Sequence, residues 1–192
     1  MARIHPAEGF DLGDLDRLDQ RTRIARLHAS VLAHRPKIAH AVNEAYRAAL
    51  EEEGTLPPRL VELVRIRLAF HNQCRSCMAV RYTSGIEDGV TEDLVCSLEK
   101  PEEAEDLTPA ERAALRFADL LATDHLAIDE SVYDDLRQYF DEGEIVELGL
   151  RCARTIGFGR LNATWMNIDH LPDRFKDVEN VLTPWGGETI TW

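Results

Sequence analysis

The sequence predicts an all-α protein with a compact fold of several helices. Apolar residues recur at helical spacing through almost every segment, whereas strand signals are nearly absent because no hairpin dipeptide separates alternating runs. The 192 residues, 44% of them hydrophobic with 11 glycines and 8 prolines, have the composition of one globular domain. We therefore expect a single domain over residues 1–192, with a core at about 36–165 and a C-terminal arm at 172–192.

The first half of the chain contains four apolar stripes separated by proline, glycine and asparagine. Two helices are expected to meet near Pro36, because proline is tolerated in a first helical turn and breaks a helix elsewhere. Gly54 to Pro58 forms a break, and Asn72 can cap the helix that follows it. The expected helices run over about 15–32, 38–50, 59–71 and 73–85.

Capping signals place the helices of the second half. Thr91 precedes two acidic residues, Asp129 starts another helix, and Thr108 forms a capping box with Glu111 around Pro109. The expected helices run over about 92–98, 110–123, 129–140 and 144–158. The string LVEL at 60–63 is echoed by IVEL at 145–148, which leaves open an internal duplication of a helical unit.

The charge balance argues against several classes of partner. The chain has 22 Lys and Arg against 35 Asp and Glu, a net charge of −13 that repels nucleic-acid phosphates and anionic lipid headgroups. No apolar stretch reaches the ~20 residues of a spanning helix, and residues 1–14 lack the pattern of a signal peptide. We expect a cytoplasmic protein that binds neither nucleic acid nor a membrane.

Cys74 and Cys77 form a CxxC motif, the most informative feature of the sequence. In a reducing cytosol such a pair is a redox dithiol, half of a metal site, or two buried apolar residues. A zinc site needs two ligands besides the two cysteines. His71 is three residues before Cys74, but the sequence has no second CxxC and no pair of histidines at zinc-ligand spacing, so we expect no metal. Cys96 and Cys152 stand in apolar helical contexts and are expected in the core.

Helical geometry relates Arg81 to the two cysteines. In a regular helix over 73–85, Cys74, Cys77 and Arg81 fall on one face, at i, i+3 and i+7, and Tyr82 falls off it. The start of that helix and the permanent cation of Arg81 would both favour thiolate over thiol. A reactive dithiol of this kind suits peroxide reduction or disulfide exchange, since one thiolate attacks and the partner thiol resolves.

The stretch around the motif, ELVRIRLAFHNQCRSCMAVRYTSG, resembles the carboxymuconolactone decarboxylase and alkylhydroperoxidase D superfamily. The superfamily pattern is a glutamate, a CxxC twelve residues later and a histidine after the second cysteine; Glu62, Cys74 and Cys77 match its first two parts. The strings GVTEDLV, LTPAERAALRFADLLA and EIVELGLRCARTIGFGRLNATW resemble later segments, so the resemblance covers roughly Leu50 to Trp165. It implies an alkylhydroperoxidase D-like helical fold and a homo-oligomer, often a trimer or hexamer.

Arg81 stands where the superfamily has its histidine. The resemblance implies that Cys77 meets the peroxide, that Cys74 resolves, and that Glu62 and the histidine relay protons. Arginine stays protonated, so it can stabilise a thiolate or bind an anion but cannot shuttle protons. Three outcomes stay open: Glu62 pairs with Arg81 while water relays protons, His71 serves as the base, or peroxidase chemistry is weak or absent.

The favoured function is a thiol-dependent peroxidase or disulfide oxidoreductase of the peroxiredoxin type. Cys77 is the expected attacking thiolate and Cys74 the resolving thiol, with Arg81 as thiolate stabiliser and Glu62 as its carboxylate partner. The substrate would be a hydroperoxide or another small molecule, a dithiol protein would be the reductant, and no dissociable cofactor is expected. The alternatives are a decarboxylase in which Arg81 and Arg65 bind an acidic substrate, and a redox-sensing oligomer without turnover.

Overall fold

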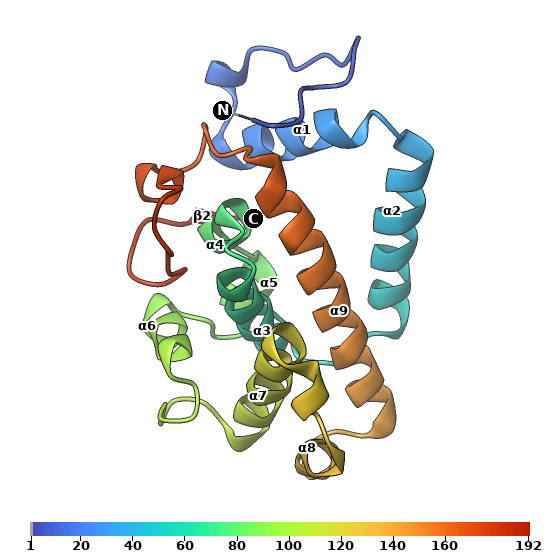
Figure 1. Cartoon of the computed structure of the whole chain (residues 1–192), viewed down its shortest axis with the longest axis vertical. Helices are drawn as coiled ribbons and strands as arrows, with labels where there is room; N and C mark the ends of the chain where they lie inside the picture. The colour runs from blue at the N-terminus through green and yellow to red at the C-terminus, as the bar shows by residue number, and fades with distance from the viewer. Residues whose placement is uncertain (1) are drawn as a thin grey trace.

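The computed structural model describes residues 2–192, and its regular secondary structure is helical apart from two two-residue strands, which confirms the all-α expectation. Three helices form its centre, namely α3 (Pro58–His71), α7 (Pro109–Thr123) and α9 (Glu142–Trp165). Each of the three packs against the other two. Figure 1 shows α9 running diagonally through much of the length of the molecule, with α7 and α8 at one end and α1 at the other.

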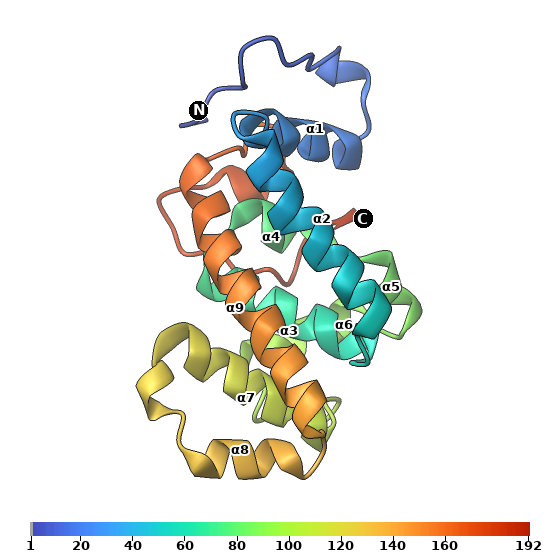
Figure 2. The same cartoon turned by 90° about the vertical axis from the view of Figure 1, so that its right-hand side faces the viewer.

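The other helices surround this centre. The remaining α-helices are α1 (Gln20–Leu32), α2 (Pro36–Glu53), α4 (Arg75–Ala79), α5 (Thr83–Glu87), α6 (Glu92–Cys96) and α8 (Glu130–Arg137), and 3-10 helices lie at Leu15–Arg17, Ser97–Glu99, His125–Ala127 and Asp173–Lys176. The α2 helix runs beside α9 (Figure 2) and has no fully buried residue. No helix in the described part of the chain is long and apolar enough to cross a membrane.

The α3 helix occupies the middle of the fold because apolar residues lie on most of its faces. Leu63, Ile66 and Leu68 are fully buried, and Pro58 opens the helix at a position where its missing N–H costs nothing. A helix buried on several sides carries its polar residues into the interior as well. Glu62 is one of them, with only 2% of its surface exposed.

Local capping places most helices where the sequence predicts them. The side-chain caps predicted at Thr91, Thr108 and Asp129 are all present. A further capping box joins Asp141 and Glu144, so α9 starts at Glu142 and extends to Trp165, well past its expected end at 158.

The prediction of one continuous helix over 73–85 is wrong. The chain there forms α4, a two-residue strand β1 (Val80–Arg81) and α5. Asn72 ends α3 instead of capping the next helix, and Gln73 adopts a left-handed φ of 49°. Arg65 accounts for part of the break, because its guanidinium donates hydrogen bonds to the backbone carbonyls of Cys77 and Val80 in place of a longer helix.

The C-terminal segment is packed into the body and is not the arm expected over 172–192. Phe175 is fully buried and Trp185 is 8% exposed. The strand β2 (Ile190–Thr191) pairs in parallel with β1, and Arg75 donates hydrogen bonds to two backbone carbonyls of the segment. The end of the chain therefore covers the residues that follow the CxxC motif.

Candidate active site

Cys74 and Cys77 are joined by a disulfide bond, with their Cα atoms 5.2 Å apart, which confirms that the two sulfurs can meet. Cys74 is the N-cap residue of α4 and is completely buried. Cys77 lies within α4, is partly exposed, and lines a cavity of about 220 Å³. Only one of the two sulfur-bearing residues therefore meets the cavity.

The cavity beside Cys77, called here the cysteine cavity, lies between α1, α4 and α9. Its lining is largely apolar and aromatic and includes Ile24, His28, Tyr82, Phe158, Asn162 and Trp192. Tyr82, which helical geometry places off the cysteine face, reaches this cavity because the helix is broken at β1. A small apolar molecule with one polar end fits such a lining.

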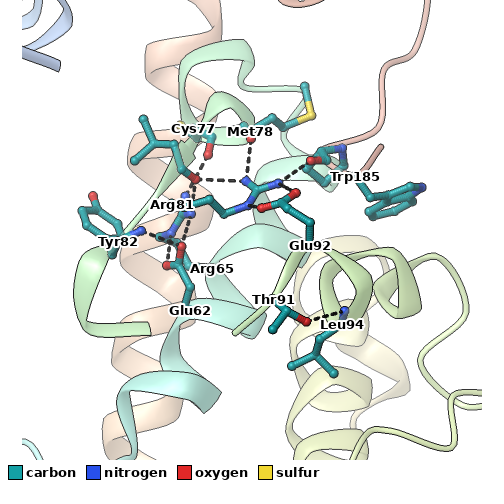
Figure 3. Close-up of polar contacts among 12 residues, drawn as sticks. Glu62, Arg65, Cys77, Met78, Arg81, Tyr82, Thr91, Glu92, Leu94 and Trp185 are labelled. Atoms are coloured by element: carbon teal, nitrogen blue, oxygen red, sulfur yellow. Dashed lines mark hydrogen bonds and ion pairs between the residues drawn. The ribbon is translucent and has the colours of Figure 1, made fainter. Parts of the chain in front are cut away.

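Glu62 pairs with Arg65, not with Arg81 as the sequence predicts. Arg65 Nε and Nη2 donate to the two carboxylate oxygens of Glu62 over 2.6 and 2.7 Å, and Figure 3 shows both side chains below the CxxC segment. Arg65 also donates to the backbone oxygens of Cys77 and Val80 over 2.8 and 2.7 Å. This fork ties α3 to the backbone of the motif and offsets a buried negative charge.

Gly85 brings α5 unusually close to Glu62. A side-chain carbon at position 85 would lie 2.6 Å from the Glu62 Cβ and 2.7 Å from its Cγ. In the same region the Tyr82 N–H donates to Glu62 Oε1 over 2.9 Å. Glycine is therefore needed at this position to let α5 settle over the carboxylate.

Arg81 is a structural cation, not a neighbour on the cysteine face. It is 2% exposed and donates to both carboxylate oxygens of Glu92 over 2.8 and 3.2 Å. It also donates to the carbonyls of Met78, Val80 and Pro184, and Figure 3 shows its guanidinium turned toward Glu92. The expected role of Arg81 as thiolate stabiliser rested on a regular helix that the chain does not form. Its expected carboxylate partner, Glu62, pairs with Arg65 instead.

His71 is held on the other side of α3, against α7. Its Nε2 lies 2.7 Å from Asp119 Oδ1, and Arg67 binds the same carboxylate. Burial alone would raise the pKa of Asp119, but the hydrogen bonds from His71 and Arg67 outweigh burial and lower it. His71 is not among the residues that line the cysteine cavity, so the geometry does not favour it as the base.

His28 is the histidine of the cysteine cavity, and sequence reasoning missed it. Its Nε2 lies 2.8 Å from Asn162 Oδ1, and its ring packs 5.2 Å from the Trp165 ring. Burial lowers the pKa of His28, and the hydrogen bond to Asn162 opposes that shift in part. The available signal was weak: a histidine four residues after Ile24 in the apolar stripe of α1.

We expect His28 to make the protein less stable at mildly acid pH. In the unfolded chain His28 takes up a proton near pH 6.5. In the folded chain its pKa is lowered, so it takes up the proton only at a lower pH. The contribution of His28 to the free energy of unfolding is therefore complete above pH ~6.5 and is lost as the pH falls toward the folded pKa. His28→Gln should remove that loss, as measured by urea unfolding between pH 5 and 8; parallel profiles for the two proteins would contradict it.

The two other cysteines differ in exposure. Cys152 is buried as expected, and burial raises the pKa of its thiol to about 12, which makes it inert. Cys96 is exposed, so its expected place in the core is wrong; it falls at the exposed end of α6. Over residues 2–192 no group of three or more His, Cys, Asp or Glu side chains is placed to hold a metal ion.

Comparison with known proteins gives relatives for part of the sequence. Residues 36–120 match the carboxymuconolactone decarboxylase family. Two uncharacterized proteins, from two strains of Mycobacterium tuberculosis, are each 34% identical over 117 residues. That match covers 60% of this chain, and the chain spans only 40% of the length of these relatives.

Solved structures share the fold. A protein of unknown function from Agrobacterium tumefaciens, with a suggested role as the antioxidant defence protein AhpD, has a TM-score of 0.61 at 22% identity, over 71% of this chain and 92% of its own. An uncharacterized peroxidase-related protein from Ralstonia eutropha, described as an alkylhydroperoxidase AhpD core, has a TM-score of 0.61 at 21% identity, over 90% and 96%. At identities this low, the two solved structures show the fold and nothing more about this chain. Residues 36–120 therefore match the carboxymuconolactone decarboxylase family in sequence, and the chain shares the fold of the two alkylhydroperoxidase D-like structures.

Proposed function

We propose that the protein is a thiol-dependent peroxidase or disulfide oxidoreductase that works through Cys77 and Cys74. The observation that carries the proposal is the asymmetry of the disulfide: Cys77 lines a cavity, whereas Cys74 is completely buried behind it. An incoming thiol or peroxide can reach the first residue and not the second. The names of the structural relatives, one of them peroxidase-related, agree with this chemistry.

The reaction proceeds in three balanced steps. The Cys77 thiolate attacks the terminal oxygen of a hydroperoxide, the O–O bond breaks, the alcohol leaves with a proton, and Cys77 becomes a sulfenic acid. The Cys74 thiol then attacks the Cys77 sulfur, which forms the disulfide and releases water. A dithiol protein, in a reducing compartment such as the cytoplasm, returns two electrons and two protons and becomes a disulfide itself.

His28 carries the proton in this proposal. Its Nε2–H can donate to Asn162 Oδ1, which leaves Nδ1 as the acceptor. His28 is the histidine of the cavity lining, and the ordinary pKa of histidine lies near neutrality. His28 takes the proton of the Cys77 thiol and gives it to the departing alkoxide, while Arg81 keeps its structural pairing with Glu92.

The test of the proposal is hydroperoxide consumption with dithiothreitol as the regenerating dithiol, together with a count of free thiols. The fully reduced, unfolded protein has four thiols. One equivalent of hydroperoxide should remove two of them, and excess dithiothreitol should sustain turnover. No loss of thiols would defeat the proposal, and loss without turnover would favour the redox sensor instead.

The decarboxylase alternative receives less support from the geometry. Its expected anion-binding residues, Arg81 and Arg65, already bind carboxylates of the chain, Glu92 and Glu62 respectively. Neither guanidinium is free for an acidic substrate unless one of these pairs opens. The intact CxxC disulfide, in contrast, is used directly by the peroxidase proposal.

Assembly into a homo-oligomer, a trimer or hexamer, is part of the proposal. Large apolar side chains are exposed on two neighbouring helices: Ile38 on α2, and Val146, Leu150 and Leu161 on α9. Burial of such residues between subunits would remove them from water. Sedimentation at micromolar concentration should give a multiple of the 21.7 kDa chain mass, and a single species at that mass would contradict it.

A further inference from the structure

A second cavity adjoins the cysteine cavity. It also has a volume of about 220 Å³ and lies between α2, α3 and α9. The two cavities share Arg65, Tyr82, Arg154 and Thr155 as lining residues. Much of the rest of its lining is apolar: Leu50, Leu56, Leu60, Val61, Val64 and Leu148. We call it the arginine cavity, because guanidinium groups stand in this apolar wall.

The arginines of this cavity differ in their partners. Arg65 is neutralised by Glu62, and Arg151 by Glu147 over 2.6 Å. Arg154 makes no ion pair within residues 2–192, and its Nη2 donates to the neutral amide oxygen of Asn43 over 2.8 Å. Arg154, which lines both cavities, therefore has no negatively charged partner in the described part of the chain.

Two buried donors at this place have no partner. The Nε of Arg154 and the hydroxyl of Tyr46 are both buried, and neither makes a hydrogen bond in the described chain. The two side chains touch, with the Arg154 guanidinium carbon 4.5 Å from the centre of the Tyr46 ring. Burial raises the pKa of Tyr46, so its hydroxyl stays a donor at any working pH. Buried polar atoms without partners are rare and costly in folded proteins.

We propose that Arg154 and Tyr46 form the recognition site for the carboxylate of a small apolar acid. A carboxylate in the cavity would compensate the cation of Arg154 next to the two orphan donors, while the apolar part of the acid lies against the leucine and valine wall. A dry cavity of ~150 Å³ accommodates a benzene ring, so the arginine cavity has room for a ring-sized acid. Because Arg154 also lines the cysteine cavity, an acid held there can extend toward Cys77.

The carboxylate site narrows the class of substrate that the proposed function would use. If the protein is a thiol peroxidase, its substrate is a hydroperoxide that carries a carboxylate at its other end. This second half of the inference rests on the proposed function, whereas binding of the acid itself does not.

The binding test uses the oxidised protein, in which no turnover can occur, and the matched pair benzoate and benzyl alcohol. Isothermal titration calorimetry should show benzoate binding at least about 10-fold more tightly than the neutral alcohol. Arg154→Met should weaken benzoate by about 10- to 100-fold, the range expected for a charged hydrogen bond. Tyr46→Phe, which removes a single oxygen, should weaken it less.

Arg160→Gln is the control, since this exposed residue of α9 contacts a backbone carbonyl away from both cavities. It should bind benzoate like the wild type, and circular dichroism should show that all variants keep their helices. Equal binding of benzoate and benzyl alcohol, or unchanged benzoate binding in both Arg154→Met and Tyr46→Phe, would overturn the inference.

The kinetic test compares cumene hydroperoxide with its para-carboxylate. The wild type should favour the carboxylated substrate in kcat/KM, and Arg154→Met should lose that preference, measured as the ratio of the two kcat/KM values in each protein. An equal preference in wild type and variant overturns the substrate assignment. Absence of turnover on both compounds counts against the proposed function alone, because the benzoate measurements decide the carboxylate site independently.

Discussion

Replacement of Cys77 by serine should reduce hydroperoxide turnover by about 10³-fold or more, the order of effect seen when an enzyme loses its nucleophile. Cys77 is the half of the disulfide that lines the cavity, and a serine hydroxyl is neither ionised at neutral pH nor a reductant. The measurement is the steady-state rate of hydroperoxide loss with dithiothreitol in excess.

Two further cysteine variants make the result specific. Cys74→Ser should still consume one equivalent of hydroperoxide and stop as a sulfenic acid on Cys77, which a dimedone adduct of increased mass would reveal. Cys96→Ser is the matched control, because Cys96 is a free and exposed thiol, and it should turn over like the wild type. If the adduct formed on Cys74 in Cys77→Ser, the assigned roles of the two cysteines would be reversed.

Arg65→Met should destabilise the folded state by about 3–5 kcal/mol, the cost of removing one partner from a buried ion pair. Glu62, which has 2% of its surface exposed, would lose its counterion in the interior. The carbonyls of Cys77 and Val80 would lose the donor that Arg65 gives them. Urea unfolding at pH 7, with both proteins in the oxidised state, measures the difference.

The size of the effect separates this pair from surface pairs. Arg116 pairs with Asp135, and the side chains are 44% and 47% exposed, so Arg116→Met should cost less than about 1 kcal/mol. Adding Glu62→Gln to Arg65→Met should recover part of the lost stability, because a neutral amide costs less to bury than a carboxylate. A loss for Arg65→Met no larger than that for Arg116→Met would show that the buried fork contributes little.

The starts of several helices could be predicted from the sequence because their causes are local. The capping box of Thr108 and Glu111 acts within one turn, and so does the cap at Asp129. The helix expected over 73–85 failed because its competitors are distant in sequence. Arg65 donates to the Cys77 carbonyl, and Arg81 pairs with a carboxylate on α6. The periodicity of apolar residues cannot predict either contact.

The same distinction runs through the candidate site. The CxxC spacing is local and correctly predicts the disulfide. His28 and Arg154 come from α1 and α9, and only tertiary packing brings them to the cavities beside Cys77. Both belong to residue types that are common on helices, so nothing in the sequence distinguishes them before the helices are assembled.

The close approach of α5 to α3 at Gly85 also sets a constraint on sequence variation. A side chain at that position would collide with the Cβ and Cγ of Glu62, so the carboxylate can keep this place only while residue 85 is glycine. Homologous chains that share this architecture should therefore carry a paired signature, glutamate at position 62 with glycine at 85, in addition to the two cysteines. A chain with CxxC but a bulkier residue at 85 is expected to hold its glutamate differently, which makes the pair a sequence fingerprint for sorting relatives into structural subgroups.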